Sequence, residues 1–146
     1  MAIANRRGHC LCGAIEYQFD EQPNWVAHCH CESCRRATSS PMTTWVSVPR
    51  TALRYTRGQL TYYQSSPGVG RGFCGTCGSP MTYEPDSLPD EVHLYAASLV
   101  DPAEAEPELH VFVDEQLPWF ETADHLPRYA TTRSGGADPI RYGPRE

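Results

Sequence analysis

The chain contains 146 residues, of which 40% are hydrophobic, and this length favours one domain with a single moderate core. Its formal net charge of −6 provides no basic footprint for binding nucleic acid. The mean hydropathy of −0.52, with no long apolar run, argues against a membrane span.

Short segments that alternate apolar and polar residues recur along the chain. In the segment over residues 14–19, Ile15, Tyr17 and Phe19 fall on one face, as in a half-buried strand. Further strands are predicted over residues 24–28, 42–48, 60–64, 71–73, 81–84, 92–97 and 109–113. The 13 prolines and 11 glycines supply the turns between them. The pattern predicts a mainly β fold of antiparallel sheets.

Helices are predicted to be few and short. Residues 32–38 are expected to make one or two turns, and residues 101–106 begin with Asp-Pro, which suits a first helical turn. Residues 117–124 are a third candidate for a short turn. We expect residues 1–133 to form a single domain and the Gly- and Pro-rich residues 134–146 to form a loosely ordered C-terminal tail.

Seven cysteines carry the clearest chemical signal in the sequence. Their number is odd, and residues 1–9 lack the apolar stretch of a signal peptide, so we expect a cytoplasmic protein with reduced thiols. Metal binding is then the preferred role for these side chains. They form three groups, which are Cys10 and Cys12; Cys29, Cys31 and Cys34; and Cys74 and Cys77.

The spacing allows two ways of sharing the cysteines between metal ions. In a ribbon arrangement, the C-x-x-C pairs at 31–34 and 74–77 hold one zinc, but their separation exceeds the usual ribbon spacing of about 15–20 residues. In the second arrangement, the first and third groups form a closed structural site. The middle group then forms a three-thiolate site with an open fourth position, as catalytic zinc sites have. The second arrangement uses every cysteine.

Histidines and other metals add further alternatives. His9, His28 and His30 flank the cysteines, and His30 as a fourth ligand would close the three-cysteine site. Adjacent residues on a tight loop rarely point at the same metal, so packing beside the site is the preferred role for these histidines. An iron–sulfur cluster is another alternative, because thiolates also bind iron.

The cysteine motifs also carry a resemblance. They read G-H-C-L-C-G-A-I-E-Y, H-C-H-C-E-S-C-R-R-A-T-S-S and F-C-G-T-C-G-S-P-M, and the chain closes with H-V-F-V-D-E-Q-L-P-W-F-E-T-A-D-H-L-P-R-Y. From Gly8 to Tyr129 the chain resembles the glutathione-dependent formaldehyde-activating enzyme family, which includes the centromere protein V domain. The resemblance implies a β-tent of antiparallel sheets with short helical turns, tied by zinc–cysteine loops. It also implies two zinc ions per chain, a structural one on Cys10, Cys12, Cys74 and Cys77 and a catalytic one on Cys29, Cys31 and Cys34.

The activity that the resemblance implies is a lyase-type condensation of glutathione with formaldehyde, giving S-hydroxymethylglutathione. We therefore expect a small-molecule thiol and an aldehyde as partners, and no nucleic acid or membrane; no oligomeric state is predicted. All 12 basic residues are arginine, which excludes a lysine Schiff base. Two alternatives stay open, which are an enzyme for another thiol or small electrophile and a non-catalytic zinc module that binds a protein partner.

Arginines next to the cysteines are candidates for substrate binding. Three thiolates on Zn²⁺ leave a net negative charge, and Arg35 and Arg36, directly after Cys34, could offset it or bind a substrate carboxylate. A solvated surface is the alternative role for both. Arg71 and Trp45 are weaker candidates, better explained as surface charge and core.

Overall fold

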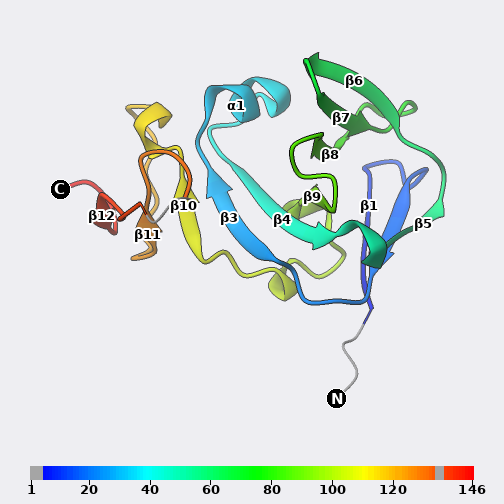
Figure 1. Cartoon of the computed structure of the whole chain (residues 1–146), viewed down its shortest axis with the longest axis horizontal. Helices are drawn as coiled ribbons and strands as arrows, with labels where there is room; N and C mark the ends of the chain where they lie inside the picture. Colours follow the sequence, from blue (N-terminus) through cyan, green and yellow to red (C-terminus); the bar gives the residue numbers. More distant parts are fainter. Residues whose placement is uncertain (1–4, 134–136) are drawn as a thin grey trace. The chain divides into compact units, whose positions relative to one another are not determined.

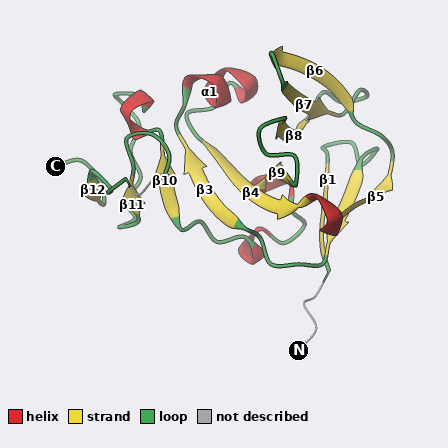
Figure 2. Ribbon diagram, viewed as in Figure 1, coloured by secondary structure: helices red, strands yellow, loops and turns green. Residues whose placement is uncertain are grey.

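The computed structural model describes residues 5–133 and 137–146. Over this range the chain is mainly β, with one α-helix, α1 (Glu32–Thr38), which confirms the predicted fold class (Figure 2). Single 3-10 turns cover Arg50–Ala52, Ala96–Ser98, Pro102–Glu104 and Val113–Glu115. In the described part of the chain, no helix is long and apolar enough to cross a membrane.

The chain divides into two compact units. The first unit comprises Met1–Trp25 and Val46–Glu106, and the second comprises Val26–Trp45 and Pro107–Glu146. The two units therefore alternate along the sequence. The chain passes from the first unit to the second in β3 (Trp25–Cys29) and back to the first in β4 (Thr43–Pro49).

The first unit contains a three-stranded antiparallel sheet and a run of antiparallel strands after the end of β4. The three-stranded sheet has the order β1 (Arg6–His9), β2 (Glu16–Phe19) and β5 (Leu53–Arg57). After β4, the second sheet continues in the order β9 (Glu91–Tyr95), β8 (Pro80–Pro85), β7 (Val69–Phe73) and β6 (Thr61–Ser66). Figure 1 shows β7 and β8 next to each other. The turn that joins them carries two of the cysteines.

The core of the first unit follows from the alternation in β2. Tyr17 and Phe19 are fully buried, as predicted, and Ile15 just before the strand is buried with them. Gly8 on β1 pairs with Tyr17, and a Cβ at Gly8 would lie 2.2 Å from the Tyr17 ring. Only glycine therefore allows the ring to cover β1 at this distance. The Tyr17 hydroxyl is 2.6 Å from Ser98 Oγ, so its polar end is satisfied.

The second unit is built on β3. Its strand order is β12 (Arg141–Tyr142), β11 (Pro127–Arg128), β10 (Leu109–Val111), β3 and the start of β4. Unlike the antiparallel pairs of the first unit, β10 lies parallel to both β3 and β11. The sequence pattern did not predict these parallel pairs, because they depend on the direction in which the chain returns from the first unit. Figure 1 shows β3 and β10 side by side, with β3 leading into α1.

The end of the chain contributes to the second unit. Of the tail predicted over residues 134–146, residues 134–136 lie outside the described range, and β12 pairs with β11. The Arg145 guanidinium donates to the carbonyls of Leu117 and Phe120. Those two residues close the single turn found in the predicted segment 117–124, through a 3.2 Å bond from the Phe120 amide to the Leu117 carbonyl.

Candidate metal centres

The first two cysteines lie in a tight loop after β1. Gly13, at φ +80°, lets the chain turn back, and its amide donates to the Cys10 carbonyl at 3.2 Å. This turn directs backbone amides at the sulfurs. The Ile15 amide donates to Cys10 Sγ at 3.3 Å, and the Ala14 amide donates to Cys12 Sγ at 3.5 Å.

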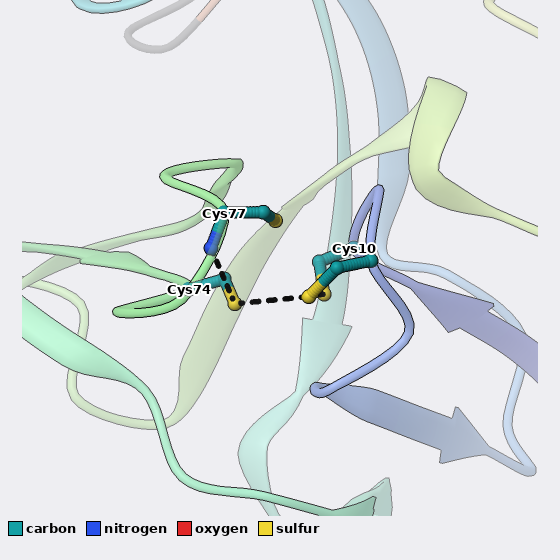
Figure 3. Close-up of side chains that lie close together, drawn as sticks. Cys10, Cys74 and Cys77 are labelled. Atoms are coloured by element: carbon teal, nitrogen blue, oxygen red, sulfur yellow. Dashed lines mark hydrogen bonds between the residues drawn. The ribbon is translucent and has the colours of Figure 1, made fainter.

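The β7–β8 turn repeats this construction with Cys74 and Cys77. Gly78, at φ +79°, donates its amide to the Cys74 carbonyl at 2.8 Å, and the Cys77 amide donates to Cys74 Sγ at 3.4 Å (Figure 3). The Ser79 hydroxyl lies 3.1 Å from Cys77 Sγ and accepts from the Leu11 amide at 3.0 Å. Ser79 therefore joins the turn to the loop after β1.

The four sulfurs of these two loops form one cluster with the geometry of a tetrahedral site. The sulfurs of Cys10, Cys12, Cys74 and Cys77 all lie within 4.8 Å of one another. Cys10 and Cys12 are 3.7 Å apart, and Cys12 and Cys74 are 3.8 Å apart. A tetrahedron with Zn–S bonds of about 2.3 Å has edges of about 3.8 Å, whereas a disulfide is about 2.05 Å long. The residues therefore fit a zinc ion.

The thiols of this cluster have opposing pKa shifts. The hydroxyl and the backbone of Ser79 lower the pKa of Cys77 to about 5. The Ala14 amide favours the Cys12 thiolate, but desolvation and the neighbouring thiols outweigh it and raise the pKa of Cys12 to about 11. Four like charges cannot form together without compensation, and a bound metal ion would stabilise all four thiolates.

The remaining three cysteines surround the start of α1. Cys29 ends β3, Cys31 is the N-cap residue of α1, and Cys34 lies in its first turn. The Cys34 amide donates to Cys31 Sγ at 3.4 Å, in the way that a hydroxyl or carboxylate usually caps a helix. All three sulfurs lie within 4.8 Å of one another. Within residues 5–133 and 137–146, no histidine nitrogen or carboxylate joins this group.

The three-cysteine cluster is largely buried and has a hydrogen-bond donor from the protein. The indole Nε1–H of buried Trp45 donates to Cys34 Sγ at 3.4 Å. Contacts within the cluster, first with Cys31, raise the pKa of Cys29 far above its ordinary value. The pKa of Cys34 is also raised, because the contact with Cys31 and burial outweigh the contact with Cys29. Here too, a cation would supply the missing compensation.

The comparisons with known proteins agree with this geometry. Residues 5–115 match the family described as "Glutathione-dependent formaldehyde-activating enzyme". The chain belongs to this family. It is 30% identical over 76 residues to an uncharacterized lyase of Schizosaccharomyces pombe, a match that covers 52% of this chain and 55% of that protein. The chain thus spans about half the length of this curated relative.

A solved structure is also similar. The crystal structure of a Rhodobacter sphaeroides protein matches with a TM-score of 0.56 and 30% identity, and the match covers 67% of this chain and 93% of that one. The resemblance to the glutathione-dependent formaldehyde-activating enzyme family, first given by the cysteine motifs, is therefore confirmed.

The cysteines assemble in the four-plus-three arrangement rather than as a ribbon. The groups are Cys10, Cys12, Cys74 and Cys77, and Cys29, Cys31 and Cys34. Both can hold a metal ion, and all seven thiols are free of disulfides. That the ions are zinc, one structural and one catalytic, stays a prediction.

The two candidate arginines already bind protein groups. The Arg35 guanidinium donates to the carbonyls of His30, at 3.3 Å, and Glu115, at 3.2 Å. Arg36 pairs with Glu32 at 2.9 Å on the exposed face of α1. Arg35 thus ties the cysteine loop to residue 115, whereas the Arg36 pair is a surface contact. Of the weaker candidates, Trp45 lies at the cluster, and Arg71 stacks over Tyr83 in the first unit.

A third group of metal-type ligands, which was not predicted from the sequence, consists of His28, His110 and Asp124. Burial and the neighbouring His110 lower the pKa of His28 to about 4, so its ring is neutral near pH 7. Burial opposes ionisation of Asp124, yet hydrogen bonds from Thr122 and Leu126 hold its pKa well below the ordinary value. No local motif marks these residues, because His28 and His110 meet through the pairing of β3 with β10 and Asp124 reaches them from the loop before β11.

Proposed function

We propose that the chain is a zinc-dependent carbon–sulfur lyase that joins a thiol, glutathione, to formaldehyde at Cys29, Cys31 and Cys34. The observation that carries this proposal is the donor set of the site. It consists of three clustered sulfurs, with no fourth protein ligand among the described residues. Three protein ligands with one position left for substrate are typical of catalytic zinc, whereas four ligands are typical of structural zinc.

The proposed reaction needs no further reactant. The thiol sulfur forms a bond to the formaldehyde carbon, the C=O π bond breaks, and the thiol proton ends on the carbonyl oxygen. The product therefore contains all atoms of both substrates, and nothing is oxidised or reduced. A bound zinc ion would supply a Lewis acid that lowers the pKa of a coordinated thiol.

The chain's own residues would keep the three sulfurs in place. The Cys34 amide donates to Cys31 Sγ, and Trp45 donates to Cys34 Sγ. Arg35 ties the carbonyl of His30, between two ligands, to that of Glu115. Such contacts around a metal site orient the ligands and tune their basicity.

The free state of all seven thiols supports the proposal that the protein works in a reducing compartment such as the cytoplasm.

The test is consumption of formaldehyde by the zinc-loaded protein, measured above the spontaneous reaction with glutathione. We expect acceleration only when glutathione is present, and none with Cys31→Ser. Equal rates with and without fully loaded protein would contradict the proposal for this substrate pair.

One observation favours a second candidate, an enzyme for another thiol or small electrophile. Both arginines that could bind the carboxylates of glutathione already donate to protein groups, Arg35 to two carbonyls and Arg36 to Glu32. A panel of thiols assayed with formaldehyde distinguishes the two candidates. A smaller thiol without carboxylates that reacts at least as fast as glutathione would favour the second.

A further inference from the structure

The sheet of the second unit presents different ligands on its two faces. Successive side chains of a strand point to opposite faces, so His28 and Cys29 on β3 face opposite ways. The neighbouring strand β4 shows the same division. Thr44 Oγ1 is 2.7 Å from His28 Nδ1, whereas the next residue, Trp45, donates to Cys34. A cysteine face and a histidine face therefore lie back to back.

Three potential ligands meet on the histidine face. His28 on β3 and His110 on β10 are paired in register, and their ring centroids are 4.7 Å apart. The Asp124 carboxylate approaches from the loop before β11, with its oxygens 3.1 and 3.2 Å from His110 Nε2. One donor atom from each of the three residues lies within 4.8 Å of the other two. Two imidazoles and one carboxylate form a common donor set for divalent transition metals.

The second nitrogen of each histidine is already held. His28 contacts Thr44 through Nδ1, and His110 Nδ1 lies 2.8 Å from Nε2 of buried His30. Nε2 is then the remaining ring nitrogen of both residues, and that of His110 contacts Asp124 and, at 3.3 Å, Thr122 Oγ1. Histidines that bind metals characteristically have their other ring nitrogen fixed by a hydrogen bond in this way.

The carboxylate is fixed just as firmly. Asp124 accepts from the Thr122 hydroxyl at 2.6 Å, from the Leu126 amide at 3.1 Å and from buried Arg128 at 3.3 Å. A carboxylate offers about four lone-pair positions, and Thr122, Leu126, Arg128 and His110 Nε2 together occupy them here. A bound cation would take the place of the contact with His110, because the same nitrogen would then coordinate the ion. Arg128 also lies 3.5 Å from Glu121, which pairs more closely with Arg141 and Arg145, at 2.9 and 3.2 Å. Arg128 is therefore a counter-ion of Asp124 and holds this carboxylate ionised and in place.

From this arrangement we propose a third metal site, in which His28, His110 and Asp124 bind a divalent first-row transition ion. The site is distinct from both cysteine clusters, because its ligands are nitrogen and oxygen and lie on the opposite face from Cys29. Its existence does not depend on the lyase reaction proposed above. Three protein ligands leave at least one coordination position for water or a small ligand.

The test compares metal binding by the wild type, Asp124→Asn and His28→Gln. Each protein is equilibrated with excess Zn²⁺, and the bound metal is counted per chain at increasing free Zn²⁺. We expect three equivalents in the wild type and two in both variants. The matched control is His93→Gln, which removes a buried histidine that pairs with Glu91 in the first unit, and it should keep three equivalents.

Co²⁺ substitution reports the type of ligand and the state of the fold. Thiolate-to-cobalt charge-transfer bands report the cysteine clusters and should be equal in all folded proteins. The third equivalent should add only weak bands typical of nitrogen and oxygen ligands. A milder variant, Thr44→Val, removes only the hydrogen bond to His28 and should weaken the third equivalent by about 10–100-fold.

Two results would overturn the proposal. One is saturation of the wild type at two equivalents with Zn²⁺, Co²⁺, Fe²⁺ and Mn²⁺, which would leave the three residues as a hydrogen-bonded triad only. The other is a third equivalent that persists in Asp124→Asn and His28→Gln, since the ion would then bind elsewhere. If a ligand variant lost the charge-transfer bands and so failed to fold, Thr44→Val would decide. A third equivalent that bound as tightly to Thr44→Val as to the wild type would overturn the proposal.

Discussion

The indole Nε1–H of Trp45 donates a hydrogen bond to Cys34 Sγ at 3.4 Å, from β4 to the first turn of α1. Sequence pattern alone would assign Trp45 to the hydrophobic core, and the side chain is indeed buried. Its indole N–H nevertheless reaches one of the three sulfurs of the three-cysteine cluster. Trp45 therefore links the packing of the second unit to the electron density on a proposed metal ligand.

Replacing Trp45 by Phe keeps an aromatic ring at this buried position but removes the donor and part of the packed volume. We expect the fold to persist, with a cost of about 1–3 kcal/mol in the free energy of unfolding from the lost hydrogen bond and the smaller ring. The affinity of the three-cysteine cluster for Zn²⁺ should fall by about 10–100-fold. Competition with a chelator measures this affinity. Trp25→Phe is the control, since Trp25 contacts His93 in the first unit; an equal loss there would contradict the assignment.

Serine substitutions in the two cysteine clusters should have different consequences. Cys77→Ser breaks a cluster that joins residues 10 and 12 to residues 74 and 77, so it should unfold at a much lower temperature or be insoluble. Cys31→Ser breaks a cluster confined to residues 29–34, so it should fold and lose the activity. Thermal unfolding and metal content are measured on both. If Cys31→Ser unfolds as readily as Cys77→Ser, the middle cluster is structural.

Chelation should remove the metal bound to the two cysteine clusters in two stages. The three-cysteine cluster has only three protein ligands, so its ion should exchange first, while the four-cysteine cluster keeps its ion. Metal content and thiolate absorption, followed against chelator concentration, check the order. Loss of both ions at the same concentration would show that the two clusters do not differ in lability.

Alanine substitutions should separate the roles of Arg35 and Arg36. Arg36→Ala removes an exposed pair with Glu32 and should change the free energy of unfolding by no more than about 0.5 kcal/mol. Arg35→Ala removes two bonds to backbone carbonyls and should lower the melting temperature measurably. The KM for glutathione is measured with both. A raised KM in Arg36→Ala, with stability unchanged, would assign carboxylate binding to Arg36.

Tyr17→Phe should alter the stability at alkaline pH. Burial raises the pKa of Tyr17 to about 12, partly offset by the hydrogen bond to Ser98. The folded state therefore holds this proton more tightly than the unfolded state, whose tyrosines titrate near pH 10. The stability advantage of the wild type over Tyr17→Phe is complete below pH 10 and is lost as the pH rises through about 12.

Denaturant unfolding of the wild type and Tyr17→Phe between pH 8 and pH 12 measures this difference. The other tyrosines titrate in both proteins, and the chain has no lysine to add a transition in this range. A wild-type advantage that stayed constant across the range would contradict the raised pKa of Tyr17.

Much of the secondary structure could be predicted because it depends on local patterns. The helix over 32–38 was predicted with its bounds, and each of the eight predicted strands overlaps an observed one. The four missed strands, β1, β5, β11 and β12, are short and carry polar or charged residues. They exist because a neighbouring strand supplies hydrogen-bond partners, which no local periodicity reveals.

The sequence by itself identified the seven cysteines, in three groups, as candidate metal ligands. A C-x-x-C turn with a glycine after it brings two sulfurs together through bonds within a few residues, so spacing alone identifies the pairs. The tertiary structure decided which loops share a metal, since the Cys74–Cys77 turn joins the loop after β1 through contacts such as that of Ser79 with Leu11. It also decided the histidine face. His30 and His110 meet across 80 residues only because β10 returns parallel to β3, and such a pairing depends on strand direction and register rather than on spacing.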